Sequence, residues 1–184
     1  MNNRTKALAS AITAALSLGL AGCITTSSPS PTPTPVVSES LTPSPTPTSS
    51  LTLSPEQQAA ADAVAKFYEV VNQVATNNEV DLNSIYEVAG GDAAQAWLRD
   101  LQAMKVAGLV QTGVAVPEVR DVEGDNEPYV VATCVDTTQA DVIDKQGKSV
   151  VGEGNPTRIL YHFTVETVGS GLRVTKSEAV STGC

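Results

Sequence analysis

The chain has 184 residues, of which 41% are hydrophobic and only 4% aromatic, and its formal net charge is −9. An acidic surface repels phosphate groups, so the composition argues against nucleic acid as a partner. With residues 1–22 and 24–54 set aside for the reasons given below, about 130 residues remain, which is the size of one ordinary domain. Valine, alanine, leucine and isoleucine must supply most of its core.

The first 23 residues have the pattern of an export signal. Arg4 and Lys6 precede an apolar stretch over residues 7–20, which is too short to span a membrane permanently. The segment Leu20-Ala21-Gly22-Cys23 then places small residues before a cysteine. This segment resembles the lipobox of bacterial lipoproteins. The resemblance implies a signal peptide at 1–22 and a diacylglycerol on Cys23 that anchors the protein at the extracytoplasmic face of the cell membrane. The alternative is an ordinary signal peptide with a chance cysteine.

A proline-rich linker follows the anchor. Eight of the eleven prolines lie between Pro29 and Pro55, among serines and threonines. Alternating prolines favour extended polyproline II structure and cannot build a core. We therefore expect residues 23–54 to be the lipidated cysteine and a disordered, semi-rigid spacer, and residues 55–184 to be the folded domain.

The chain has three cysteines, at positions 23, 134 and 184. If Cys23 carries lipid, two remain in an exported segment, where an oxidising environment favours a Cys134–Cys184 disulfide. Closing a loop of that size stabilises the fold by roughly 4 kcal/mol in the chain-entropy model. Two free thiols are the alternative.

Helical patterns dominate the first half of the domain. Ser54 and Gln57 form the pattern of a capping box around Pro55. Apolar residues then recur at helical spacing, which predicts a helix of about 20 residues ending near residues 76–78. A second, short helix is predicted over 82–89. A third is predicted from Asp92, as its cap, to Gly108.

Strand patterns follow Gly108. We expect strands at about 109–120, 128–136, 140–144, 156–168 and 171–181, joined by turns rich in glycine, aspartate and asparagine. Apolar residues at 159, 161, 163 and 165 alternate with mostly polar neighbours, as in a sheet covered on one side. The element order predicts an α+β domain with N-terminal helices packed on a curved antiparallel sheet.

This element order, residues 129–136 (YVVATCVD) and the ending 172–184 resemble the nuclear-transport-factor-2-like fold. The resemblance implies a cone formed by the curved sheet and closed by helices. Similar lipid-anchored domains with a cysteine pair and a Thr/Pro-rich stalk occur in high-GC Gram-positive bacteria. The fold supports enzymes and binding modules alike, so it does not assign a chemistry.

No catalytic set stands out among the residues. His162 is the single histidine, and its strand parity places it opposite Tyr161 and Phe163, away from the helix-covered side. Enzymes of the resembling fold pair an aspartate base with a tyrosine donor. Tyr161, Tyr86 and Tyr129 are possible cavity residues of that kind, but no aspartate matches the base. Buried core tyrosines are therefore the preferred interpretation.

The acidic stretch 121–127 alternates carboxylates around Gly124, as calcium ligands can. It lacks the twelve-residue loop pattern, so a solvated acidic hairpin is the preferred interpretation, and neither a metal nor a cofactor is predicted. The leading functional hypothesis is a non-catalytic, lipid-anchored module that binds a protein, a wall component or a small apolar ligand. The alternatives are a cone-cavity enzyme of the isomerase or cyclase type and a phage-type lipoprotein that blocks a surface receptor.

Overall fold

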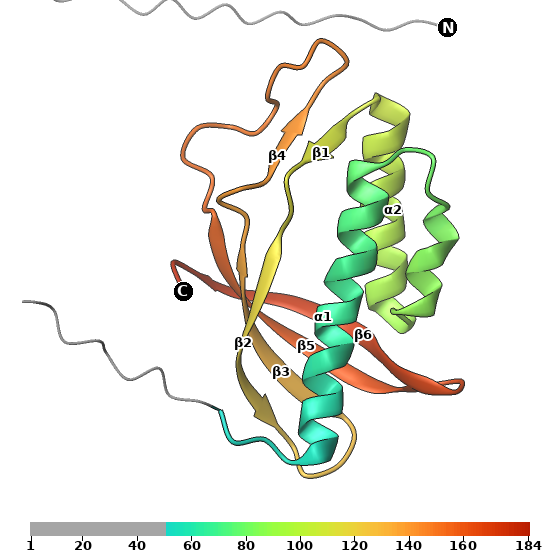
Figure 1. The fold of residues 1–184 in the computed structure, drawn as a ribbon, viewed down its shortest axis with the longest axis vertical. Helices are drawn as coiled ribbons and strands as arrows, with labels where there is room; N and C mark the ends of the chain where they lie inside the picture. Colours follow the sequence, from blue (N-terminus) through green and yellow to red (C-terminus); the bar gives the residue numbers. More distant parts are fainter. Residues whose placement is uncertain (1–50) are drawn as a thin grey trace, which may run out of the picture. The chain divides into compact units, whose positions relative to one another are not determined.

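Three helical segments precede six strands in the structure, a computed structural model that describes residues 51–184 (Figure 1). The helical segments are α1 (Pro55–Thr76), the 3-10 helix η1 (Leu82–Glu87) and α2 (Gly91–Ala107). The strands are β1 (Val110–Thr112), β2 (Val116–Glu123), β3 (Tyr129–Asp136), β4 (Asp141–Ile143), β5 (Arg158–Val168) and β6 (Gly171–Thr182). The helices pack on one face of a four-stranded antiparallel sheet, which confirms the predicted α+β class.

Helix α1 begins where the sequence predicts. The Ser54 hydroxyl accepts a hydrogen bond from the Gln57 amide at 3.2 Å, and the Gln57 side chain accepts one from the Ser54 amide at 3.0 Å. The side-chain nitrogen of Gln57 also donates to the carbonyls of Val122 and Gly124, both at 3.2 Å. Gln57 therefore both closes the capping box and binds the start of α1 to the turn between β2 and β3.

The segment after α1 differs from the prediction. Residues 82–87 form a 3-10 helix, which ends before residue 89 because the following backbone pairs with β6. Val174 accepts a hydrogen bond from the Gly90 amide at 2.9 Å and donates one to the Val88 carbonyl at 3.0 Å. The predicted cap of α2 at Asp92 is wrong, because Gly90 occupies the N-cap position. Since glycine has no side chain, this helix begins without a side-chain capping bond.

The four-stranded sheet has the order β2-β3-β5-β6. The prediction of one strand over 109–120 is wrong, because Gly113 adopts a positive φ of 67° and turns the chain. Strand β1 instead pairs with β4 in a separate two-stranded sheet, above the main sheet in Figure 1. The predicted strand 140–144 is thus real but shorter, and it lies outside the main sheet.

Aromatic side chains fill the middle of the helix–sheet interface. Phe67 of α1 and Phe163 of β5 have no exposed surface, and their ring centroids lie 6.0 Å apart. Trp97 of α2 packs edge-on against Phe67 at 5.4 Å. The predicted apolar stripe of α1 is buried throughout. Within residues 51–184, none of the helices combines the length and the apolar character needed to cross a membrane.

Candidate functional site

A cavity of about 140 Å³ lies at one end of the helix–sheet interface, and we call it the aromatic cavity. Its walls come from α1, α2, the β1–β2 segment, β3 and β5. Most of the lining is apolar or aromatic, and the complete set is Tyr68, Val71, Trp97, Gln111, Ala115, Val135, Thr137, Ile159 and Tyr161.

Two tyrosine hydroxyls belong to this lining, and neither forms a hydrogen bond with another described residue. Tyr68 is only 2% exposed. Its hydroxyl is nevertheless not fully enclosed, because Oγ1 of Thr133 is the one fully enclosed side-chain polar atom without a hydrogen-bond partner in residues 51–184. The small exposed part of Tyr68 must therefore include its hydroxyl, and this exposure is to the cavity that Tyr68 lines.

Burial keeps both hydroxyls protonated. It raises the pKa of Tyr68 far above its ordinary value, with a further contribution from nearby Tyr161. Burial also raises the pKa of Tyr161, which is half-buried. Both groups thus remain neutral hydrogen-bond donors, and neither can act as a base near neutral pH.

A hydrogen-bond network holds the polar wall in place. Asn72 of α1 donates to the Ala115 carbonyl at 2.9 Å and accepts from the Ala115 amide at 3.0 Å. Gln111 donates to Oδ1 of Asn72 at 3.0 Å and to the Gly113 carbonyl at 3.2 Å. The side-chain nitrogen of Gln111 is thereby occupied, and its side-chain oxygen remains an acceptor.

A second cavity, of about 220 Å³, shares Gln111 and Thr137 with the aromatic cavity. It extends under the β4–β5 loop and is lined by Val142 and Val151 among others. Its one carboxylate, Asp141, accepts hydrogen bonds from the Ser149 hydroxyl and the Val142 amide, both at 2.8 Å.

The three tyrosines named from the sequence are not brought together. Tyr161 lines the aromatic cavity. Tyr86 is 49% exposed on η1 and lines a separate, open depression with Arg99 and Lys105. Tyr129 is buried on β3 and does not line the aromatic cavity.

The aromatic residues that line the cavity together with Tyr161 are Tyr68 and Trp97, and not Tyr86 or Tyr129. Tyr68 lies on the flank of the predicted apolar stripe of α1. Its burial becomes apparent only when both sides of the helix are seen to be covered, so the sequence pattern alone did not single it out.

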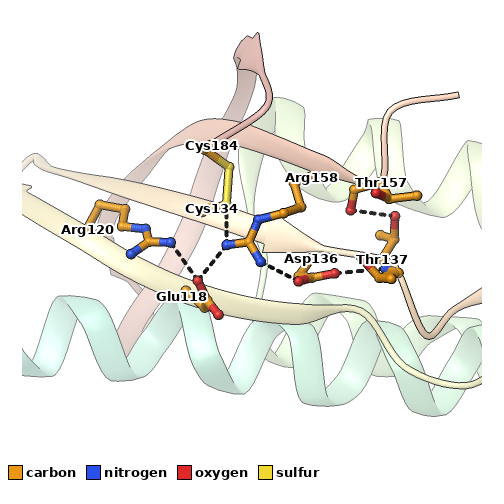
Figure 2. Close-up of a disulfide and its surroundings, with 9 residues drawn as sticks. Glu118, Arg120, Cys134, Asp136, Thr137, Thr157, Arg158 and Cys184 are labelled. Atoms are coloured by element: carbon orange, nitrogen blue, oxygen red, sulfur yellow. Dashed lines mark hydrogen bonds and ion pairs between the residues drawn. A yellow bond between two sulfur atoms is a disulfide. The ribbon is translucent and has the colours of Figure 1, made fainter. Parts of the chain in front are cut away.

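The opposite face of the sheet carries a disulfide between Cys134 and Cys184, which confirms the predicted pairing (Figure 2). Arg158 lies beside it and donates to Sγ of Cys134 at 3.4 Å, to Glu118 at 2.8 Å and to Asp136 at 2.5 Å. We call the set Glu118, Arg120, Cys134, Asp136, Arg158 and Cys184 the disulfide cluster.

Strand register explains the disulfide cluster. Glu118 pairs with Cys134 across β2 and β3, and Asp136 pairs with Arg158 across β3 and β5. Side chains alternate along strands, so all of these point away from the helices. The acidic partners were missed because they become neighbours only through pairing across three strands.

His162 lies on this same face, as its strand parity predicts. It is half-buried on β5, and its register partners are Ala132 on β3 and Glu178 on β6. The single histidine is thus separated from the aromatic cavity by the sheet itself.

The charges of the disulfide cluster stabilise one another. Hydrogen bonds from Thr138 hold the pKa of Asp136 below its ordinary value, and the Arg158 guanidinium adds to this effect. The hydrogen bond to Glu118 raises the pKa of Arg158, with Asp136 contributing as well. Arg120 makes a further ion pair with Glu118 at 2.6 Å. Two cations thus face two carboxylates around the sulfur atoms.

The acidic hairpin does not gather ligands for a metal. In the described part of the chain, no group of three or more histidine, cysteine, aspartate or glutamate side chains is arranged to hold a metal ion. Glu127 instead binds the neighbouring strand: its two carboxylate oxygens accept hydrogen bonds from the amide and the hydroxyl of Thr167, both at 2.7 Å.

Comparison with known proteins shows a likeness of fold. No protein-family model matches the chain, and no curated protein matches it. Among solved structures, the domain is similar to the intermembrane space region of the chloroplast protein ARC6, with a TM-score of 0.54 and 16% sequence identity. The match covers 68% of this chain and 97% of the ARC6 chain. At this identity, the likeness shows the fold alone.

Proposed function

We propose that this protein is a lipid-anchored, extracytoplasmic binding module, and that the aromatic cavity receives an uncharged apolar group of its ligand. The observation that carries the proposal is the lining of that cavity. Its nine residues include no carboxylate, imidazole, amine or thiol, and its two tyrosine hydroxyls have raised pKa values. Such a lining can bind and orient a small molecule, but it supplies no base or nucleophile at neutral pH.

The anchor rests on the sequence pattern at Cys23, in the part of the chain outside the described residues. A signal peptide at 1–22, lipid on Cys23 and a spacer to residue 54 would hold the domain 55–184 away from the membrane. The Cys134–Cys184 disulfide supports an oxidising compartment, because cytosolic thiols are kept reduced.

An isomerase or cyclase acting on a small apolar molecule is the second candidate, in line with the nuclear-transport-factor-2-like resemblance. The unpartnered hydroxyls of Tyr68 and Tyr161 favour it, since such donors can polarise a carbonyl. Binding without turnover is preferred because the aromatic cavity has no carboxylate beside these donors.

Binding can be tested with uncharged probes of the right size. Benzene, p-cresol and indole should give saturation-transfer signals in NMR, since a cavity near 150 Å³ accepts a benzene-sized molecule. Trp97 is the single tryptophan, so its fluorescence should respond to the same probes. Ala115→Leu fills the cavity and should abolish both signals. Val114→Leu, at an exposed neighbouring position, should preserve them. Equal signals from both variants would contradict the proposed site.

The anchor has its own test. Cys23→Ala should move the protein from the membrane fraction to the medium, and the wild type should incorporate a labelled fatty acid. Failure of the wild type to incorporate label would remove the basis for membrane anchoring while leaving the binding proposal intact.

A further inference from the structure

The two sulfur atoms of the disulfide differ sharply in their surroundings. Cys134 lies in the middle of β3 with no exposed surface, whereas Cys184 lies in the exposed segment after β6. Thiol–disulfide exchange depends on which sulfur an incoming thiolate can reach. Attack from solvent is therefore directed to Cys184, and Cys134 becomes the leaving group.

Arg158 is placed to stabilise that leaving group. Its Nη2 already donates to Sγ of Cys134 at 3.4 Å, and the guanidinium is held from the other side by Glu118 and Asp136 (Figure 2). A guanidinium hydrogen bond to sulfur favours the thiolate over the thiol, and a more stable thiolate leaves faster. Because the carboxylates balance the two arginine charges, this effect comes from the directed hydrogen bond and not from an excess of positive charge.

The chain also holds Cys184 close after cleavage. The Gly183 amide donates to the Arg158 carbonyl at 2.9 Å, so the segment before Cys184 is bound to β5 independently of the disulfide. A mixed disulfide on Cys184 would thus stay near the Cys134 thiolate, which favours re-formation of the original bond by intramolecular attack.

We propose that Cys134–Cys184 is an exchange-active disulfide that reacts with low-molecular-weight thiols at Cys184. The incoming thiolate forms a bond to Sγ of Cys184 as the Cys184–Cys134 bond breaks, and the bonding electron pair stays on Cys134 as a thiolate. One disulfide replaces another, so the step needs no external oxidant or reductant; the thiol's proton goes to solvent. This inference is independent of the ligand in the aromatic cavity.

Site selectivity can be measured with reduced glutathione as the probe. The full chain carrying Cys23→Ala, so that only the disulfide cysteines remain, is treated under native conditions, quenched with acid and labelled with iodoacetamide after denaturation. Peptide mass spectrometry should find glutathione on Cys184 and the alkyl label on Cys134. Glutathione on Cys134, or no mixed disulfide before the protein is unfolded in urea, would overturn the proposal.

The contribution of Arg158 is tested by the rate at which glutathione cleaves the disulfide and by titration of the Cys134 thiol. Arg158→Gln should slow cleavage by about 3–10-fold, if the rate depends on the pKa of the leaving thiol about as strongly as on the pKa of the attacking thiol. Arg158→Lys should recover part of the rate. Arg120→Gln is the matched control, because Arg120 binds Glu118 but not sulfur, and its rate should equal the wild-type rate.

A purely structural role for Arg158 predicts a different outcome. Loss of structure would speed up cleavage by exposing the bond, so circular dichroism is recorded for each variant. The titration uses the chain with Cys23→Ala and Cys184→Ser, in which Cys134 is the single thiol. Its thiolate absorbance should have a lower titration midpoint when Arg158 is kept than when Arg158→Gln is added. Equal midpoints and equal rates would overturn the assignment of Arg158.

Discussion

Thr133 shows how a single side chain can oppose the stability of its own strand. It has no exposed surface, and its Oγ1 is fully enclosed without a hydrogen-bond partner in the described part of the chain. Val119 and Tyr161 are its register partners on β2 and β5. An unsatisfied buried hydroxyl costs about 1–3 kcal/mol. The hydroxyl of Thr133 therefore opposes the stability that the rest of β3 contributes.

Thr133→Val should therefore stabilise the domain. Valine has almost the same shape and removes the unsatisfied hydroxyl, so the free energy of unfolding should rise by about 1 kcal/mol in urea titrations. Thr164→Val, on the opposite face of the sheet, is the control and should change stability by less than about 0.5 kcal/mol. A destabilised Thr133→Val variant would indicate a hydrogen bond that the hydroxyl makes in solution.

Asp136 should make stability depend on pH. Its folded pKa is lowered, so it stabilises the fold above its unfolded pKa, and this contribution is lost as pH falls through the folded pKa. The difference in free energy of unfolding between wild type and Asp136→Asn should thus be largest near neutral pH and shrink below about pH 4. A difference that stays constant down to about pH 2 would exclude this linkage.

At the scale of elements, the start of α1 joins the two layers of the domain. Gln57 closes the capping box and also binds two carbonyls of the β2–β3 turn. Local capping and tertiary contact thus depend on the same side chain, and both are satisfied only when α1 lies against the sheet edge.

Gln57→Ala should lower the free energy of unfolding by about 1–2 kcal/mol, because it removes one capping bond and two hydrogen bonds to the turn. Gln58→Ala is the matched control. The Gln58 side chain donates to Asp62 of its own helix at 2.8 Å, so its loss should cost less than about 0.5 kcal/mol. Urea unfolding of the three proteins compares them directly, and equal losses would mean that the contacts with the turn contribute nothing.

At the scale of the whole molecule, the disulfide joins residues 50 positions apart and thereby links β3 to the end of β6. Cys184→Ser should lower the free energy of unfolding by about 4 kcal/mol, chiefly because the unfolded chain gains conformational entropy without the crosslink. Urea unfolding measures this loss. Adding reductant should bring the wild type to the level of the variant, whereas a reduced wild type that keeps its full stability would show that the crosslink is not a stabilising constraint.

Local patterns determined much of the fold. The capping box at Ser54, the apolar stripe of α1 and the alternation in β5 depend on residues a few positions apart, so the sequence predicts them directly. The disulfide was predicted by counting cysteines under the hypothesis of export. The split of 109–120 was not predicted, because only pairing of β1 with β4 distinguishes a turn at Gly113 from a continuous strand.

The sites, in contrast, were decided by tertiary structure. Tyr68 of α1 and Tyr161 of β5 line the same cavity, and Arg158 reaches Cys134 through the pairing of β3 with β5. Both arrangements join residues far apart in the chain, and both depend on a strand register that the covered face of the sheet sets. By itself the sequence determined most of the elements, the acidic charge and the cysteine pair. Only packing decided which side chains became neighbours. Hydrophobic burial is non-directional, so an apolar face in the sequence shows that an element will be covered but not which residues will cover it.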